Sequence, residues 1–365
     1  MSKRSSLPGR WFEIARIQIG GAGGDPSNNF IRSLRKSQRK DYLIGMCSVP
    51  SDLFLADTEE KHVVPYATDP GYPQAILRLL RRTRPDFLHL QHDFEVRAIS
   101  HIQDQVQELG VKLFMPAPDT IENCIDKYKS YKIWKKAGIR VPETLLLHCS
   151  EDLRLAFEKF GLKVWIRATE GGGGAGALPA DDFDFARLWV DRFEGWGSFT
   201  AAEYLTSSSV TWLSIWYGGQ LIVGQTRRRK SWKFGSRALS GVTGITGIGE
   251  TCSDPIVDRV AQDAILAVDA KPHGIFGVDM TYDQEGFPNP TEINIGRFFT
   301  THFFFTEAGL NMPEIYCDLA LEGKFPTLER KINPLPDGLV WIRGMDVTPV
   351  LTTAEELEKM ERRAL

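Results

Sequence analysis

Residues 274–297 read GIFGVDMTYDQEGFPNPTEINIGR, and the interpretation of the whole chain starts from this stretch. An apolar, β-rich run leads to Asp279, and residues 283–286 supply the polar and glycine residues of a turn. Residues 291–295 then alternate between polar and apolar side chains with a period of two, which is typical of a strand with one buried face. The pattern therefore predicts a β-hairpin.

A turn at residues 285 and 286 would place Asp279 across from Glu292. Asn294 would share a face with Glu292, because residues two apart in a strand point the same way. Two prolines in the second strand cannot donate ladder hydrogen bonds and suit only an edge strand or a bulge. Two carboxylates and an amide oxygen, with no His or Cys nearby, suit magnesium rather than zinc. An exposed hairpin that carries acids by chance is the structural alternative.

Length and composition limit the classes of protein to consider. At 365 residues the chain is long enough for two or three domains with their own cores. Its 44 basic and 47 acidic residues leave a net charge of -3, so we expect neither a nucleic-acid nor a membrane partner. Five scattered cysteines without C-x-x-C spacing argue against a disulfide framework or a zinc site and indicate a reducing compartment. The N-terminus lacks the apolar core of a signal peptide, so we expect a cytoplasmic protein.

The first third of the chain alternates between strand and helix signals. Strands are predicted at 12–20, 42–49, 86–91 and 111–115, and helices at 28–36, 74–82 and 96–109. This alternation indicates βαβ units and a parallel sheet, as in a Rossmann-like domain.

Two segments at predicted strand ends lie where open α/β sheets bind ligands. The glycines of 20–24 do not complete a G-x-G-x-x-G fingerprint, because Pro26 stands where a glycine is needed, so a nicotinamide site and a plain tight turn are both open. After the strand 86–91, Asp93 and Glu95 could face a substrate crevice, or Asp93 could cap the helix that begins near residue 96.

From Asp126 the pattern changes to a helix that ends at Gly138, and a new domain is predicted to begin here. Ser150 looks like the N-cap of a second helix, and the strand 162–168 follows it. Five glycines lie within residues 171–176, and Arg167 precedes them. Such a loop lets backbone N–H groups approach an anion, so it is a phosphate flap or, alternatively, a flexible linker.

Residues 198–226 are predicted to form strands, with a hairpin about Gly218 and Gly219. The basic run 227–230 follows, and a glycine- and serine-rich loop extends to residue 249. The run is either a solvated face or a set of cations for phosphate or an anionic substrate. Asp254 opens a helix that leads into the hairpin, and His302 is expected to be a core residue. The tail is predicted to add a strand at 339–347 and a charged last helix.

Several of these segments, in this order, resemble the ATP-grasp superfamily and most nearly its carbamoyl-phosphate-synthase-like carboxylate–amine ligases. The segments that carry the resemblance are Asp126-Lys127, Arg167 before the glycine loop, Glu203-Tyr204-Leu205, Asp279, Glu292-Ile293-Asn294 and Arg297. The resemblance covers nearly the whole chain. It implies an α/β fold with a Rossmann-like preATP-grasp domain at 1–120, an ATP-grasp domain at 121–330 with a mobile glycine-rich lid around 145–200, and a C-terminal strand and helix extension at 331–365.

The resemblance also implies roles for individual residues. Lys127 and Arg167 contact the phosphates of ATP, the loop 171–176 closes over them, and the hinge 203–205 meets adenine through backbone groups. The ATP contacts implied in this way are Lys127, Arg167, Gly171, Gly172, Gly173, Gly174, Glu203, Tyr204 and Leu205.

On the same resemblance, Asp279, Glu292 and Asn294 hold magnesium, with two ions expected and manganese able to substitute. Arg297 steadies the acyl phosphate and, together with Arg167, forms the catalytic pair. These roles suit phosphoryl transfer, which needs positioning and charge neutralisation more than covalent help from the protein.

Three departures from the family pattern stand out. Arg167 replaces the lysine of many relatives, which favours the carbamoyl-phosphate-synthase branch. Ser207 or Ser208 stands where many relatives have a carboxylate that binds ribose. Arg297 follows Asn294 by three residues, one more than in many relatives.

The function expected is an ATP-dependent ligase that phosphorylates a carboxylate and passes the acyl group to an amine, releasing ADP and phosphate. A nucleotide-binding regulatory module is the alternative, motivated by the missing ribose carboxylate, and a nicotinamide oxidoreductase rests only on the first glycine turn. The expected partners are small-molecule carboxylates and amines, and a homodimer is compatible with the resemblance.

Substrate specificity is expected to come from the strand ends at 21–24 and 93–95 and from a basic loop at 227–237. Asp93 or Glu95 would suit an amine or hydroxyl group on the acceptor, and Arg228 or Arg229 would suit an anionic donor. The alternative is that Asp93 caps a helix and the arginines are solvated.

Overall fold

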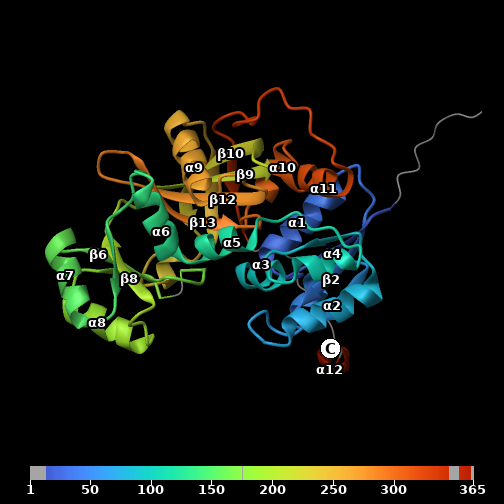
Figure 1. Cartoon of the computed structure of the whole chain (residues 1–365), viewed down its shortest axis with the longest axis horizontal. Coiled ribbons are helices and arrows are strands. Elements are labelled where there is room, and N and C mark those ends of the chain that lie inside the picture. Colours follow the sequence, from blue (N-terminus) through green and yellow to red (C-terminus); the bar gives the residue numbers. More distant parts are fainter. Residues whose placement is uncertain (1–13, 175, 345–352, 363–365) are drawn as a thin grey trace, which may run out of the picture.

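The computed structural model describes residues 14–174, 176–344 and 353–362. Three β-sheets organise the described chain (Figure 1), with strand orders β3-β2-β1-β4, β13-β12-β9-β10-β11-β14 and β5-β8-β6-β7. The mixed α/β architecture agrees with the predicted fold class. The strands of the first sheet precede the predicted boundary at residue 120, and those of the other two sheets follow it.

The first sheet is parallel throughout and confirms the predicted Rossmann-like alternation. Its strands are β1 (Arg16–Ile19), β2 (Tyr42–Cys47), β3 (Glu60–Val63) and β4 (Phe87–His89). Its helices are α1 (Asp25–Lys36), α2 (Tyr72–Thr83), α3 (Asp93–Ser100) and α4 (Gln103–Glu108), and the 3-10 turn η1 (Asp52–Leu55) precedes β3. Both α1 and α2 begin earlier than predicted and carry a proline in their first turn, where the missing N–H is harmless.

Two predictions for this region are wrong in detail, and one strand was missed. The predicted helix 96–109 is two helices, and Ser100 at the break donates a hydrogen bond to the Arg97 carbonyl oxygen (2.7 Å), which competes with helical bonding. Strand β3 was not predicted. The predicted strand 111–115 makes only an isolated bridge through Lys112, next to a β4 that is only three residues long.

The central sheet is antiparallel and holds the predicted hairpin. Its strands are β9 (Ser209–Tyr217), β10 (Gln220–Trp232), β11 (Thr246–Thr251), β12 (Gly274–Tyr282), β13 (Pro288–Ile295) and β14 (Val340–Ile342). Asp279 pairs with Glu292 as predicted, and the register shifts directly after this pair. Strand β13 is at the edge of the sheet, which explains why Pro288 and Pro290 are tolerated there.

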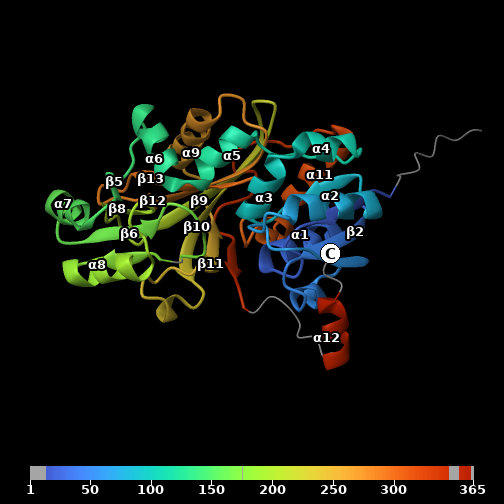
Figure 2. The ribbon, with the colours of Figure 1, turned by 60° about the horizontal axis from the view of Figure 1, so that its bottom comes forward.

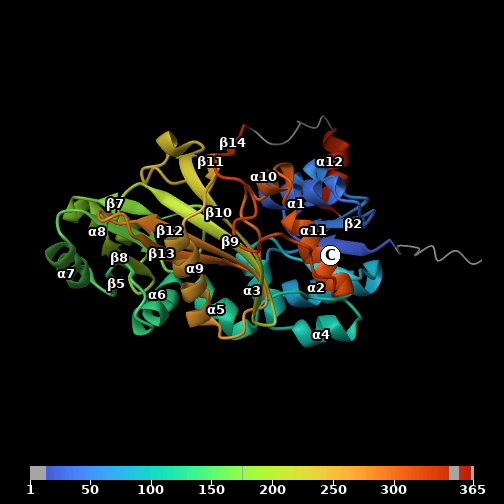
Figure 3. The same ribbon diagram turned by 90° about the horizontal axis from the view of Figure 1, so that it is seen from above.

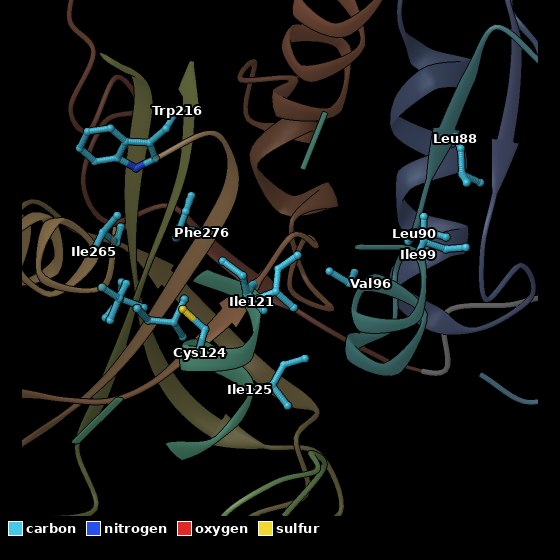
Figure 4. Packing of buried hydrophobic residues seen from close by; sticks show 14 of the residues in the cluster. Leu88, Leu90, Val96, Ile99, Ile121, Cys124, Ile125, Trp216, Ile265 and Phe276 are labelled. Carbon is cyan, nitrogen blue, oxygen red and sulfur yellow. The ribbon is translucent and has the colours of Figure 1, made fainter. Parts of the chain in front are cut away.

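One face of the central sheet packs on three helices. These helices are α5 (Pro118–Ile125), α6 (Lys127–Lys136) and α9 (Pro255–Val268). Figure 4 shows this core running from Leu88 and Val96 through Ile121 to Phe276 and Ile265. The buried indole of Trp134 donates a hydrogen bond to the Ala264 carbonyl oxygen (2.9 Å), so α6 is fastened to α9.

The opposite face of the central sheet changes character along its strands. At one end Ile215 and Ile275 are buried with the aromatic segment that contains α10 (Phe303–Glu307) and α11 (Met312–Glu322). His302 is fully buried in this segment and hydrogen-bonds the Phe299 carbonyl oxygen (2.7 Å), as expected for a core residue. At the other end the same face carries Thr211 and Asp279, and here it forms the floor of a cavity.

The third sheet forms a separate unit at the left of Figure 1. It contains β5 (Thr144–Leu147), β6 (Val164–Ala168), β7 (Leu178–Ala180) and β8 (Phe199–Glu203), and its helices are α7 (Ser150–Phe160) and α8 (Phe183–Arg192). The unit has its own buried cluster, distinct from the two larger cores. Cys149, and not Ser150 as predicted, occupies the N-cap of α7. We call this sheet with its two helices the lid.

The C-terminal part returns to the beginning of the chain. Strand β14 joins the central sheet, and the rest of the predicted strand 339–347 from residue 345 on lies outside the described residues. Helix α12 (Ala354–Glu361) lies beside the first sheet and not beside β14 (Figure 2 and Figure 3). All five cysteines are free, as predicted. Within the described ranges, no helix combines the length and the apolar character needed to cross a membrane.

Close packing in the central sheet makes a test of stability possible. A Cβ added at Gly224 of β10 would lie 2.3 Å from an indole carbon of Trp212 on β9. Gly224→Ala must therefore displace a buried ring, and we expect it to lower the free energy of unfolding by about 1–3 kcal/mol in urea titrations. Gly172→Ala is the matched control, because a Cβ there meets no atom within 4 Å. Equal stability of the two variants would contradict the packing argument.

Candidate active site

A cavity of about 750 Å³ lies where the lid, the central sheet and the first sheet meet. Its floor is formed by β10, β12 and β13, and the lid contributes the ends of β6 and β8. Two glycine-containing loops, 171–174 and 240–246, line the rest of it. These loops are in close contact, since a Cβ on Gly174 would lie 2.7 Å from the Val242 carbonyl oxygen. The cavity is therefore largely covered.

Two carboxylates and an amide gather on the floor of the cavity. Asp279 accepts hydrogen bonds from the Thr211 hydroxyl and from the Asn294 amide (Nδ2–Oδ2 3.1 Å). Glu292, on the neighbouring strand, lies opposite Asp279 in the register. The Arg229 guanidinium is 3.4 Å from Asp279 Oδ1. The structure thus brings together the three predicted metal ligands.

The surroundings of Asp279 favour its charged form. Burial by itself would raise the pKa of this carboxyl, but the charge of Arg229 and the hydrogen bond from Thr211 outweigh burial and hold the pKa below its usual value. Asp279 is therefore an anionic oxygen donor at neutral pH. An ionised carboxylate of this kind is what a hard cation such as Mg²⁺ prefers.

Two cations face Glu292 from two different elements. Lys127 begins α6, whose N-cap Asp126 accepts from the backbone N–H of Tyr128 (2.9 Å), and Arg167 stands near the end of β6. Lys127 Nζ is 3.8 Å and an Arg167 guanidinium nitrogen 3.9 Å from Glu292 Oε2. Burial lowers the pKa values of both cations, and the charge of Glu292 partly offsets that effect. Both predicted phosphate contacts therefore lie beside a predicted metal ligand.

The glycine loop begins next to these cations. Lys127 Nζ donates a hydrogen bond to the Gly171 carbonyl oxygen (2.6 Å). Gly171, Gly173 and Gly174 have φ values of 90°, 70° and 74°, in a backbone region that residues other than glycine rarely adopt. The sequence of the loop is therefore explained by its backbone conformation and by its close approach to the cavity.

The predicted hinge lines one end of the cavity. Glu203 is tied to Glu143 twice, because its backbone N–H donates to the Glu143 carbonyl oxygen and its carboxylate accepts from the Glu143 N–H, each at 2.9 Å. Tyr204 and Leu205 also line the cavity, and so does Ser207, whereas Ser208 does not. Of the two serines predicted near the ribose, the structure brings only Ser207 to the cavity.

Arg297 links the central sheet to the first sheet. Its guanidinium forms a bidentate pair with Asp93 (Nη2–Oδ2 3.0 Å) and donates to Asn294 Oδ1 (2.6 Å). The alternative that Asp93 caps helix α3 is wrong, because His92 is the N-cap and its ring accepts from the Phe94 N–H (3.3 Å). Asp93 therefore lies at the cavity as a partner of Arg297.

Glu95 and the first glycine turn lie outside the cavity lining. Glu95 is 7% exposed and accepts a hydrogen bond from the Tyr72 hydroxyl (3.2 Å). A Cβ on Gly20 would lie 2.5 Å from Glu95 Oε2, so this carboxyl fills the space beside the first turn. Residues 21–24 are absent from the lining as well, whereas Pro26 is part of it. The acceptor contact predicted for Glu95 is therefore not supported by its position.

The basic run 227–230 belongs to strand β10. The prediction that these residues form a loop is therefore wrong. Strand alternation turns Arg227 and Arg229 toward the cavity, whereas Arg228 and Lys230 lie near Glu250 (3.9 and 2.7 Å). The donor contact predicted for Arg228 is thus misplaced by one residue, and Arg227 was missed. If the period-two alternation of the preceding strand is continued through residues 227–230, Arg227 and Arg229 fall on the same face, and this pattern would have identified Arg227. Burial lowers the pKa of Arg227 to about 9.

Comparisons with known proteins agree with this architecture. No protein-family model matches the chain. A segment of 89 residues is 39% identical to biotin carboxylase 1, chloroplastic, of Populus trichocarpa and spans 23% of this chain. The chain thus matches 17% of the length of that curated relative, which leaves the activity of the whole protein to be proposed.

Solved structures match over most of the chain. L-amino acid ligase from Bacillus licheniformis aligns with a TM-score of 0.64 at 14% identity, covering 84% of this chain and 74% of that one. Biotin carboxylase from Campylobacter jejuni aligns with a TM-score of 0.66 at 16% identity, covering 86% and 72%. Carboxyaminoimidazole ribonucleotide synthase from Aspergillus clavatus aligns with a TM-score of 0.66 at 14% identity, covering 88% and 80%.

The chain has an α/β fold in which a Rossmann-like unit precedes two sheets that enclose a cavity. The chain shares this fold with the solved L-amino acid ligase, biotin carboxylase and carboxyaminoimidazole ribonucleotide synthase. The fold is the one that the resemblance to the ATP-grasp superfamily implies.

Glu95 gives a testable pH dependence of stability. Burial raises the pKa of its carboxyl from 4.5 to about 7. Because the folded-state value is the higher one, the stabilisation is fully present below pH 4.5 and is lost as the pH rises through about 7. Glu95→Gln keeps a neutral side chain, so its stability relative to the wild type should increase over this range by up to about 3 kcal/mol in urea titrations. Parallel profiles of the two proteins would contradict this environment for Glu95.

Proposed function

We propose that this chain is an ATP-dependent ligase that activates a carboxylate as an acyl phosphate and transfers the acyl group to an amine. The observation that carries the proposal is the meeting of Lys127, Arg167 and Glu292 over one cavity, with distances of 3.8 and 3.9 Å to the carboxylate. Cations that bind phosphate and an acid that would hold a metal must be neighbours in such an enzyme, because both would neutralise charge on the same phosphates.

The nucleotide is proposed to occupy the cavity between the hinge 203–205 and the glycine loop 171–174. The Aspergillus clavatus synthase was solved with ATP and the Campylobacter jejuni biotin carboxylase with β-γ-ATP, which supports ATP as the cosubstrate here. Lys127 and Arg167 would hold the phosphates, and backbone groups of the hinge would meet adenine. The glycine loop would exclude water from the reacting groups.

Asp279, Glu292 and Asn294 are proposed to hold magnesium, with two ions expected and manganese able to substitute. The donor set fits, since every donor atom is an oxygen and Asp279 is anionic. Within the described residues no cluster of three or more His, Cys, Asp or Glu side chains could hold a metal, so phosphate and water would complete the coordination. When bound, the metal would neutralise charge on the phosphate oxygens.

The proposed reaction has two displacements. In the first, a carboxylate oxygen forms a bond to the terminal phosphorus of ATP while the bond to the ADP oxygen breaks. In the second, the amine nitrogen bonds to the acyl carbon, phosphate leaves, and the amine loses a proton. Arg297 would steady the acyl phosphate, and Arg167 would hold the transferred phosphoryl group. We propose small-molecule substrates, a cytoplasmic location and a homodimer for this enzyme.

A second candidate is a nucleotide-binding module without ligase chemistry. Ser207 lines the cavity after the hinge, where many ATP-grasp relatives have a carboxylate for ribose, and this observation favours a weakened or altered nucleotide site. Calorimetric titration with ATP and magnesium, followed by a phosphate-release assay across pooled carboxylates and amines, separates the two candidates. Binding without release from every pool would favour the module.

Glu292→Ala tests the ligase proposal. Loss of this carboxylate removes a metal ligand and leaves Lys127 and Arg167 without their shared anion, so we expect ATP-dependent phosphate release to fall by roughly 100-fold or more. Glu285→Ala is the matched control, because Glu285 lies in the turn of the same hairpin with its side chain 75% exposed. Circular dichroism would verify that both variants are folded. Unchanged turnover in a folded Glu292→Ala protein would exclude the proposal.

A further inference from the structure

Two arginines on β10 face the cavity, and the deeper one has no carboxylate partner. Arg227 is 1% exposed and donates to three hydroxyl groups, those of Thr246 (2.8 Å), Thr301 (2.7 Å) and Thr211 (2.7 Å). Among the described residues, no carboxylate oxygen lies within 4.0 Å of its guanidinium. A buried cation that faces only neutral partners carries a large desolvation penalty, which an anion in the cavity would offset.

Arg229, two residues further on the same strand face, reaches the cavity itself. It donates to the hydroxyls of Ser209 (2.8 Å) and Thr246 (3.1 Å), and its closest carboxylate is Asp279 at 3.4 Å. Only Arg229 contacts Asp279, although the charge of this carboxylate acts on both guanidinium groups, so two positive charges against this one negative charge leave a surplus of one. A metal ion held by Asp279 would increase the surplus further.

The other cations of the cavity have partners in the structure or in the proposed reaction. Arg297 is paired bidentately with Asp93, and Lys127 and Arg167 both face Glu292. Lys127 and Arg167 also leave a surplus of one positive charge against Glu292, which the phosphates of ATP offset in the proposed function. The surplus on β10 is then left for a second anion.

The register of the central sheet places this surplus away from the phosphate cations. Glu292, Asp279, Thr211 and Arg227 are paired in series across β13, β12, β9 and β10. Neighbouring strands are about 4.8 Å apart, so Arg227 and Glu292 are separated by roughly 14 Å of sheet. An anion on β10 therefore lies on the opposite side of the two acids from Lys127 and Arg167.

We propose that Arg227 and Arg229 form the subsite for the carboxylate of the donor substrate, which rests on the proposed ligase function. Arg229 contacts the carboxylate, and Arg227 is a positioning residue that supplies charge from behind and orders the threonine hydroxyls. The guanidinium carbon of Arg229 lies 3.7 Å from the centroid of the Trp232 ring, and that of Arg227 lies 4.6 Å from the centroid of the Phe299 ring. Both rings line the cavity. The donor is accordingly a monocarboxylate with an apolar or aromatic body.

A binding experiment tests the subsite without requiring turnover. Benzoate, acetate and inorganic phosphate are titrated calorimetrically into protein saturated with MgADP. Benzoate should bind the wild type, and Arg229→Gln should weaken it by about tenfold or more, as expected for loss of a charge-assisted hydrogen bond. Arg228→Gln is the matched control, since Arg228 lies on the opposite face of the same strand with its side chain 46% exposed. The benzoate affinity and the MgADP affinity of Arg228→Gln should both equal those of the wild type.

The positioning role of Arg227 has its own readout. Arg227→Lys retains the buried charge and should keep benzoate affinity within a few-fold of the wild type, whereas Arg227→Met should lose it. If Arg227→Met fails to fold, Arg229→Gln and its control Arg228→Gln still decide the proposal.

Several results would overturn the subsite. These are absence of benzoate and acetate binding to the wild type, equal affinity in Arg229→Gln, or a loss confined to inorganic phosphate, which would assign the arginines to the phosphoryl group. Failure of the ligase function appears differently, as absence of ATP-dependent phosphate release from the wild type with every substrate pool. If the wild type turns over a carboxylate and Arg229→Gln has an unaltered KM for it, the subsite is wrong and the ligase function stands.

Discussion

The carboxylate of Glu292, held between an ammonium and a guanidinium, is the interaction on which the rest of the structure depends. Glu292 comes from the edge strand of the central sheet, Lys127 from the first turn of α6, and Arg167 from a strand of the lid. Charges buried to this degree are strongly unfavourable unless they are paired. The contact therefore joins the lid, the edge strand of the central sheet and the first turn of α6 at one carboxylate.

The central sheet meets a second constraint, because one of its faces must be core at one end and cavity at the other. On β9 and β12 the side chains of Ile215 and Ile275 are buried with the aromatic segment, whereas Thr211 and Asp279 on the same face are polar. Strand geometry keeps these four side chains on one face of the sheet, so the change from apolar to polar side chains must occur along the strands and not from one face to the other. The register shift directly after Asp279 lies within the polar part, since Thr281 on the same face also lines the cavity. Core and site are thus built by one continuous sheet.

Much of this arrangement is visible in the sequence wherever the information is local. The hairpin with Asp279 opposite Glu292 follows from alternation and turn chemistry, and the cap of α6 follows from Asp126. Arg227 was missed because a run of four basic residues was taken as a loop, although strand alternation would have separated it from Arg228. Glu95 was misplaced for a different reason, since only the tertiary approach of Gly20 and Tyr72 encloses it. Contacts between distant segments leave no periodic signal.

The contacts between the first sheet and the lid differ in strength from those at Glu292. Arg97 of α3 binds Glu170, at the start of the glycine loop, through both guanidinium ends (2.8 and 3.0 Å) and also binds Glu122 (2.8 Å). Its partner Glu170 is 40% exposed, and exposed pairs contribute at most about 1 kcal/mol. The hydrogen bonds from Arg97 to Glu170 therefore define the position of the glycine loop but contribute little to its stability. In the proposed ligase a covering loop would need this combination, because it would have to be ordered when closed and still open fast enough to exchange the contents of the cavity.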